Sequence, residues 1–202
     1  MNTVSTETRR YEQRARAESR RETRDRIAAA AAELHEEKGV AKTTVAEIAR
    51  RAGVTRLTVY NHFADLSELI PACSAHYAAQ HPLPDFDRLL ELEQLEERAD
   101  AALAALYAWY RETEPLFGKL FSDRGSVPEL DRFMEGDIDR MQAELADDIT
   151  APVAARGRGA QRLSALVRVA LDFWTWHRLN AMGLDDGEAA ALMAAAVANV
   201  EP

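Results

Sequence analysis

The sequence of 202 residues predicts an all-α fold. No segment alternates polar and apolar residues as a half-buried strand does. Alanine, leucine, glutamate and arginine dominate the chain, and all four are strong helix formers. Glycine and proline fall mostly between the periodic segments, where helices begin and end. These observations predict about nine helices, with a helix-turn-helix at the N-terminus and a larger helical domain after it.

The first helix is expected over about 25–38. Ile27 and Leu34 belong to an apolar stripe at helical spacing, and Gly39 follows as the expected C-terminal stop. Upstream, arginine and glutamate interleave without an apolar stripe. Residues 1–24 therefore form an arginine-rich extension, which is either a solvated continuation of the helix or a disordered arm.

Two short helices, 45–52 and about 56–62, follow with Gly53 between them. Thr44 and Glu47 have the spacing of a capping box, in which each side chain bonds the backbone N–H of the other residue. Two short helices joined by a tight glycine turn are typical of a helix-turn-helix.

The second short helix offers hydrogen-bond donors and no carboxylate. Thr55 can cap it, and Arg56 is its charged residue. Contact with phosphates and base edges needs donors without acidic repulsion, so this face suits nucleic acid. Its polar residues are Thr55, Arg56, Thr58, Tyr60, Asn61 and His62.

Asp65 and Glu68 repeat the capping pattern and open a fourth helix over about 66–80. Pro71 removes a backbone hydrogen bond inside this helix and is expected to kink it. The kink is either a hinge or a local bend.

The later segments expected to be helical are 88–113, 115–122, 128–149, 160–182 and 186–199. Pro115 and Pro128 suit first-turn positions, where a proline costs no hydrogen bond. Asp185 with Glu188 caps the last helix.

The net charge of −9 is divided unevenly along the chain. Residues 1–63 carry 13 Arg and Lys against 9 Asp and Glu, whereas residues 64–202 carry 12 against 25. Overall acidity argues against DNA binding, but a basic segment on an acidic chain indicates nucleic-acid contact by that segment. Ordinary surface variation is the alternative.

Several other function classes are disfavoured. The single cysteine, Cys73, excludes an intramolecular disulfide and a cysteine zinc cluster, and we expect it to be a buried small hydrophobe. No phosphate loop, nucleophile elbow or metal-spaced group occurs, so neither an enzyme, a metal site nor a cofactor is expected. The longest apolar runs, Ala101–Tyr110 and Ala189–Val200, are too short to cross a membrane, and no secretory signal precedes them. A cytoplasmic protein is expected.

The segment from Lys42 to Phe63 resembles the DNA-binding signature of TetR-type transcriptional regulators. The resemblance covers about Ile27–Ile70, and it rests on Thr43-Thr44, Ile48-Ala49, Ala52-Gly53-Val54 and Val59-Tyr60 with His62-Phe63. It implies a homodimer that places two recognition helices in the major grooves of a pseudo-palindromic operator on double-stranded DNA. The implied domains are the extension (1–24), the DNA-binding domain (25–70) and an effector-binding and dimerisation domain (71–202).

The resemblance also implies roles for individual residues. Thr44, Tyr60 and His62 match positions that hold backbone phosphates. Thr55, Arg56 and Thr58 match positions that meet base edges, and a guanidinium can pair bidentately with guanine. The alternatives are a phosphate contact for Arg56, packing within the motif for Tyr60, and capping or packing for His62.

One departure from the family pattern concerns the start of the fourth helix. Many relatives carry a phosphate-binding lysine there, whereas this chain has Leu66. We expect some of the arginines between Arg9 and Arg24 to compensate by touching DNA, for instance in a minor groove. A freely solvated tail is the alternative.

Residues 64–202 hold 11 of the 14 aromatic residues, which favours a helix-lined pocket for a small apolar or aromatic effector. For each residue, packing in the core or dimer interface is the alternative. The implied function is a repressor released from its operator by the effector; a DNA-organising or protein-interaction module on the same fold is the second hypothesis. The pocket candidates are Tyr77, Trp109, Tyr110, Phe117, Phe121, Phe133, Met134, Met141, Phe173, Trp174 and His177.

Overall fold

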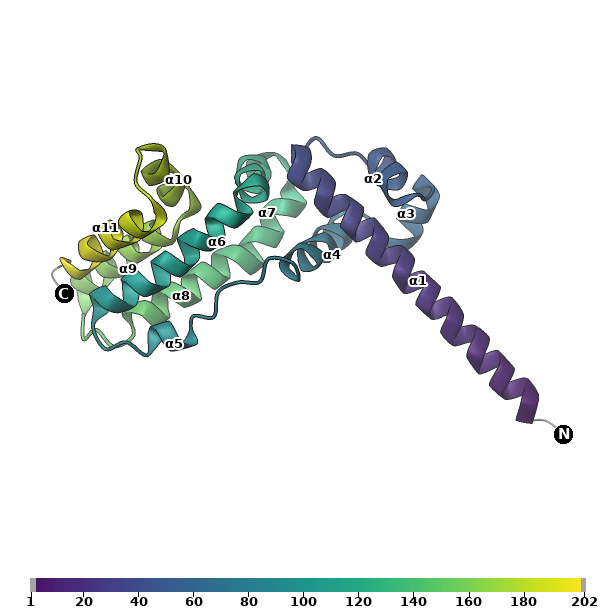
Figure 1. Cartoon of the computed structure of the whole chain (residues 1–202), viewed down its shortest axis with the longest axis horizontal. Coiled ribbons are helices and arrows are strands. Elements are labelled where there is room, and N and C mark those ends of the chain that lie inside the picture. Colours follow the sequence, from purple (N-terminus) through teal and green to yellow (C-terminus); the bar gives the residue numbers. More distant parts are fainter. Residues whose placement is uncertain (1–2, 201–202) are drawn as a thin grey trace. The chain divides into compact units, whose positions relative to one another are not determined.

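The computed structural model describes residues 3–200, with side chains from residue 9 onward, and confirms the all-α fold (Figure 1). The chain divides into two compact units. The head unit comprises Met1–Gln80 with Gly118–Asp131, and the body unit comprises His81–Phe117 with Arg132–Pro202. The first two residues of the predicted extension lie outside the described residues.

The first helix, α1, spans Thr3–Lys38 without interruption (Figure 1). The predicted start near residue 25 was therefore wrong, and of the two alternatives for the extension the helical one is observed. The extension is rich in helix formers and has no glycine or proline, so nothing in it stops the helix. Gly39, at φ 87°, ends α1 as predicted.

The head core forms where the second half of α1 packs against three shorter helices. These are α2 (Val45–Ala52), α3 (Arg56–His62) and α4 (Leu66–Ala78). Each fully buried Ile, Val or Phe contributes about 1.5–3 kcal/mol through burial. The largest buried side chains include Ile27, Leu34, Ile48, Val59, Phe63 and Leu69.

The fourth helix differs from its prediction in two details. It ends at Ala78, two residues before the predicted end, while Pro71 lies inside it as predicted. The capping box is also shifted: Asp65 accepts from the Ser67 amide at 2.8 Å, while Glu68 accepts from the Ala64 amide at 3.0 Å.

The loop after α1 is held by the end of a helix distant in sequence. The Ala41 amide donates to Asp123 Oδ2 at 3.0 Å, and this oxygen lies against Gly39. A Cβ atom on Gly39 would collide with that oxygen, so this position needs glycine for space as well as for its positive φ.

We expect Gly39→Ala to destabilise the head by about 2 kcal/mol, because it adds backbone strain and displaces the Asp123 carboxylate. Urea unfolding followed by far-UV circular dichroism measures the change. Gly125→Ala is the matched control, since a Cβ there has no neighbour within 4 Å. Equal midpoints for the two variants would contradict the assignment.

The head core also contains a buried histidine. His35 is 3% exposed, and its Nδ1 lies 3.5 Å from the sulfur of Cys73, which is buried as predicted. Its Nε2 has no hydrogen-bond partner within the described part of the chain. Burial lowers the pKa of His35 to about 4, although the nearby charge of Asp123 opposes the shift.

This depressed pKa predicts an acid-sensitive head. Above pH 6.5 His35 is neutral in both states, whereas below it the unfolded chain takes up a proton that the folded chain refuses until about pH 4. Stability should therefore fall by about 1.5 kcal/mol between pH 6.5 and 5. Urea unfolding of wild type and His35→Gln at both pH values tests this. An equal pH dependence in the two proteins would exclude His35 as the cause.

The body begins with a short helix and a long one. These are α5 (Asp87–Leu90) and α6 (Leu95–Asp123), although the end of α6 from Gly118 onward belongs to the head unit. The predicted break at Pro115 was wrong, because α6 continues through it. Thr113 and Leu116, on either side of the proline, are buried, so packing on both sides offsets the one missing hydrogen bond.

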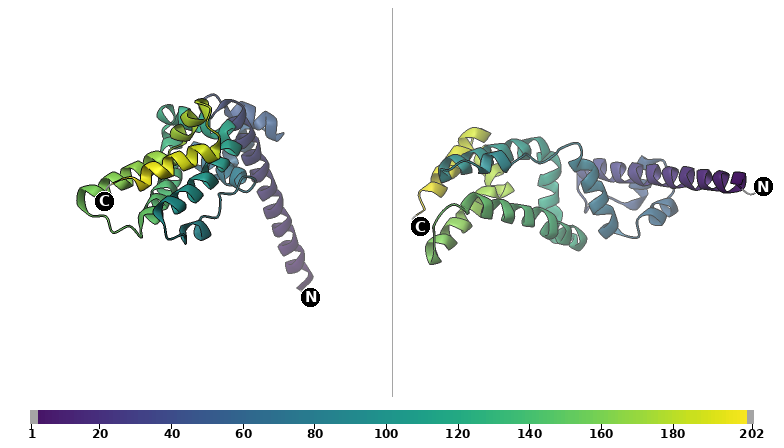
Figure 2. Two further views of the ribbon diagram at one scale, coloured as in Figure 1. Left: turned by 60° about the vertical axis from the view of Figure 1, so that its left-hand side comes forward. Right: turned by 90° about the horizontal axis from the view of Figure 1, so that it is seen from below.

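The remaining elements belong to the body, except that the stretch up to Asp131 belongs to the head unit. A π-helical segment at Glu135–Asp139 interrupts the predicted helix 128–149. Pro128 begins a helix, and Asp185 with Glu188 forms a capping box, both as predicted. In the body, α9 packs against α8, α10 and α11 (Figure 2). The elements are η1 (Arg124–Ser126), α7 (Pro128–Met134), the π segment η2 (Glu135–Asp139), α8 (Arg140–Thr150), α9 (Gly157–Leu171), α10 (Phe173–Ala181) and α11 (Asp186–Ala198).

The predicted helix 160–182 is divided at Asp172, which is extended (φ −69°, ψ 132°). Its side chain caps α10 by accepting from the Thr175 amide at 3.0 Å. The carbonyls freed at the end of α9 accept from α6: Tyr107 Oη donates to Ala170 O at 2.6 Å, and Tyr110 Oη donates to Leu171 O at 2.7 Å. These two bonds replace the hydrogen bonds that the carbonyls of Ala170 and Leu171 would have accepted in a continuous helix.

No helix within residues 3–200 combines the length and the hydropathy that a membrane crossing requires.

Candidate nucleic-acid interface

The helix-turn-helix is built by local hydrogen bonds that the sequence specifies. The Thr44 amide donates to Glu47 Oε2 at 3.1 Å, and the Glu47 amide donates to Thr44 Oγ1 at 3.3 Å, which completes the predicted capping box. Gly53 adopts the left-handed conformation (φ 67°, ψ 35°) that ends α2. The Val54 amide then donates to Ala49 O at 2.9 Å and closes the turn.

The third helix is anchored on one side and open on the other. Val59 is 2% exposed and packs into the head core, whereas Tyr60 on the outer side is 54% exposed. Arg56 and Asn61 are exposed as well. No Asp or Glu occurs between Glu47 and Asp65, so this surface lacks the negative charge that would repel phosphate.

The threonines of the motif hold one another in place. Thr55 caps α3 by accepting from the Thr58 amide at 3.1 Å, and the two hydroxyl oxygens lie 2.9 Å apart. Thr44 Oγ1 donates to Glu47 Oε2 at 2.7 Å. These contacts fix the hydroxyls at the N-termini of α2 and α3, where backbone N–H groups also favour anions.

His62 is half-buried at the end of α3. Burial lowers its pKa, and the charges of Arg20 and Arg24 lower it further. A neutral imidazole can donate one hydrogen bond to a phosphate but brings no charge of its own. The backbone oxygen of His62 accepts a hydrogen bond from Arg24 Nη1.

The basic side chains of the head fall into two groups. Arg51 forms ion pairs with Glu37 at 2.8 Å and with Glu33 at 3.0 Å, so carboxylates of the head neutralise its charge. The Lys38 ammonium similarly pairs with Glu47, and this contact with the Thr44 bonds lowers the Glu47 pKa to about 2. By contrast, Arg56 is exposed and forms no ion pair with a described residue.

One exposed residue of α3 was not selected from the sequence. Leu57 is 69% exposed, which is unusual for leucine in a short helix against a core. Leu57 lies nearly opposite the buried Val59 on the helical wheel, and this position could have indicated its exposure. The predicted contact residues of this helix were all polar, so they did not include Leu57. An apolar side chain in a major groove can contact the methyl group of thymine. Leu66, in contrast, is partly buried and packs against the head core.

The pocket candidates separate between the two units. Tyr77 and Phe121 belong to the head. In the body, Met134 is fully buried, whereas Phe133 and Met141 are partly buried. The other six form part of a contiguous aromatic cluster: Trp109, Tyr110, Phe117, Phe173, Trp174 and His177.

The cluster includes aromatic residues that were not predicted. Trp176 is 1% exposed and lies 5.7 Å from Tyr110 between ring centroids. Tyr107 stacks beside Tyr110 at 6.4 Å. Trp176 was missed because the break at Asp172 changes the helical phase, which turns Phe173 and Trp176 inward. Trp174 and His177 lie at the partly exposed edge.

Comparisons with known proteins agree with this geometry. Residues 27–73 match the family model described as bacterial regulatory proteins, tetR family. The HTH-type transcriptional regulator SrpR of Pseudomonas putida is 43% identical over 83 residues, which are 41% of this chain and 38% of SrpR. The uncharacterized HTH-type transcriptional regulator TtgW, also of Pseudomonas putida, is 43% identical over 84 residues, covering 41% of this chain and 61% of TtgW. The chain thus matches less than two thirds of either relative.

Solved structures show similar folds over most of the chain. The TetR family transcriptional regulator PfmR from Thermus thermophilus has a TM-score of 0.61 and 22% identity, covering 89% of this chain and 97% of PfmR. A putative TetR-family regulator from Mesorhizobium loti has a TM-score of 0.61 and 20% identity, covering 88% of this chain and 96% of that protein. At these identities the likeness concerns the fold.

Proposed function

We propose that the chain, whose residues 27–73 match the model of the tetR family of bacterial regulatory proteins, is a sequence-specific transcriptional repressor released from DNA by a small molecule. The observation that carries the proposal is the outer face of α3. It presents Arg56, Leu57, Tyr60 and Asn61 with no carboxylate, on a helix fixed by its Thr55 cap and by buried Val59.

The proposal assigns DNA contacts to the predicted residues. Thr44, Tyr60 and His62 hold backbone phosphates, while Thr55, Arg56 and Thr58 meet base edges. Asn61, exposed on the same helix, lies within this contact surface. A cytoplasmic location is consistent with DNA as the partner, and the proposal includes no catalytic role.

The proposed regulator acts as a homodimer on a pseudo-palindromic operator. Two copies place their recognition helices about 34 Å apart, or a multiple of that distance. The last helix supports the dimer, since α11 has no charged residue beyond Glu188 and exposes Leu192 at 50%. Val169 on α9 is 51% exposed and extends the apolar surface of the body.

The proposed effector is small and apolar or aromatic, and it binds at the aromatic cluster of the body. Trp174 and His177 form the accessible edge of this cluster. Release then follows from a population shift: the effector binds the conformation in which the recognition helices are wrongly spaced, so operator affinity falls.

Selection of bound DNA from a random pool tests the proposal. We expect one pseudo-palindrome to bind at least about a thousandfold more tightly than random DNA. A small-molecule screen for release from that site then tests the effector. If no selected site exceeds random DNA, the DNA-organising hypothesis replaces the repressor.

A further inference from the structure

The face of α1 that packs inside the head continues beyond it as a row of arginines. At about 100° per residue, Arg9, Arg16, Arg20 and Arg24 fall within an arc of about 80° on the helix. No Asp or Glu of the extension falls in this arc. The apolar core residues in the same arc are Ile27, Ala31 and Leu34.

The row begins at the recognition helix. Arg24 donates from Nη1 to the backbone oxygen of His62, and its guanidinium carbon lies 4.0 Å from the ring centroid of Phe63. These two contacts fix α1 against the C-terminal end of α3. Beyond Arg24 the row continues along the helix for about 22 Å to Arg9.

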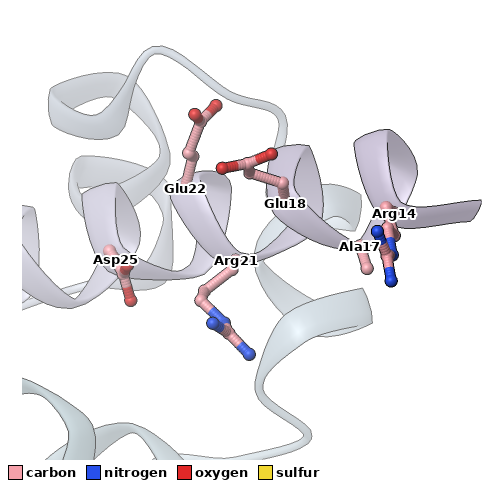
Figure 3. Close-up of a pocket in the computed structure, with 6 residues that line it drawn as sticks. All are labelled: Arg14, Ala17, Glu18, Arg21, Glu22 and Asp25. Atoms are coloured by element: carbon pink, nitrogen blue, oxygen red, sulfur yellow. The ribbon is translucent and has the colours of Figure 1, made fainter. Parts of the chain in front are cut away.

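Charge on the extension is sided. A shallow groove lies along α1 and is lined by that helix alone (Figure 3). In this view Arg14 and Arg21 point to one side of the helix, where Asp25 also lies, whereas Glu18 and Glu22 point to the other. At about 100° per residue all the residues that line this groove fall outside the arc of the row, so Glu18 and Glu22 lie away from Arg9, Arg16 and Arg20.

Such a row is unfavourable for a helix that only meets water. Arg16 lies four positions from Arg20, and Arg20 four from Arg24, so each pair places like charges one turn apart. The ion pair that Glu12 forms with Arg16 is long, at 4.0 Å, and exposed. A polyanion lying along the row would replace this repulsion with attraction.

We propose that Arg9, Arg16 and Arg20 bind the phosphate backbone of duplex DNA beside the bases that α3 reads. The inference rests on the proposed DNA-binding function and extends its contact surface along a rigid helix. These contacts add affinity and position the head, and they carry no sequence preference.

The test compares two triple variants of the full chain that remove equal charge. Arg9→Gln with Arg16→Gln and Arg20→Gln removes the three arginines proposed to bind phosphate and keeps Arg24, while Arg156→Gln with Arg158→Gln and Arg162→Gln removes three exposed arginines of the body. Glutamine and arginine have similar helix propensities, so α1 should persist, as far-UV circular dichroism can verify. Affinity is measured against salt concentration for the selected site and for random duplex DNA.

We expect the row variant to flatten the slope of log affinity against log salt by about 0.9 for each phosphate that is no longer bound, equally on both DNAs. The body variant should retain the wild-type slope, and lysines in the row should retain it too. A wild-type slope in the row variant, or equal flattening in both variants, overturns the inference while operator selection stands. If wild-type protein selects no site, the proposed function fails, and the slopes on random DNA still decide the role of the row.

Discussion

Replacing Arg98 by alanine is expected to destabilise the body by about 3–5 kcal/mol, because it removes a buried guanidinium and leaves three backbone carbonyls without their donor. Arg98 is 1% exposed at the start of α6. Its Nε donates to Leu92 O at 2.7 Å, Nη2 donates to Glu93 O at 3.0 Å, and Nη1 donates to Ile149 O at 3.0 Å. One guanidinium thus connects the loop before α6 to the end of α8.

The position of Ile149 makes this connection electrostatic as well. Its carbonyl lies at the C-terminal end of α8, where the partial negative charge of the helix favours a cation. Arg98→Lys keeps the charge but reaches fewer carbonyls, so it should lose less stability than alanine.

Urea unfolding followed by tryptophan fluorescence measures this effect, since Trp109, Trp174 and Trp176 all lie in the body. Arg168→Ala is the control. Arg168 is 52% exposed in a 3.8 Å pair with Asp147, so its removal should change stability by less than about 1 kcal/mol. Equal effects of the two substitutions would show that water replaces the hydrogen bonds of Arg98 at little cost.

The parts of the fold that could be predicted from the sequence depend on residues close together in the chain. The Thr44 and Glu47 capping box, the Thr55 cap and the glycine stop at Gly53 all form within four residues. Such signals are visible in the sequence because both partners occur in the same short window. The helix-turn-helix was predicted for this reason.

The break at Asp172 could not be predicted in the same way. It is satisfied by Tyr107 and Tyr110, whose hydroxyls bond carbonyls 63 and 61 positions away. Helical periodicity continues across Asp172 in the sequence, so only the tertiary bonds reveal the division. The same contacts decide which of Trp174 and Trp176 faces the core.

The polar residues of the candidate interface could be predicted from the sequence, but its apolar residue, Leu57, could not. Thr58, Tyr60 and Asn61 are recognisable by their chemistry, whereas the exposure of Leu57 depends on where the core lies. The sidedness of the extension was hidden for a related reason. Its arginines form a row only once α1 is known to be one continuous helix.

Arg56→Ala is expected to remove about 1–3 kcal/mol of discrimination from each half-site, which a two-fold operator doubles. Arg56 is the first residue of α3, exposed and without an ion pair to any described residue, so its guanidinium is available to a base edge. Affinity for random DNA should change little, because a base contact contributes only where the matching base is present.

The measurement separates the two roles of Arg56. A base reader lowers operator affinity selectively and hardly changes the salt dependence, whereas a phosphate contact weakens operator and random DNA alike and flattens the salt slope by about 0.9. Arg50→Ala is the matched control, an exposed arginine of α2 without an ion pair in the described chain.

If Arg56→Ala changes operator affinity no more than Arg50→Ala does, or weakens binding to operator and random DNA equally, the sequence specificity must come from neighbouring residues. Leu57 and Asn61 then become the side chains to substitute, because they are the exposed residues of α3 beside Arg56 and Tyr60.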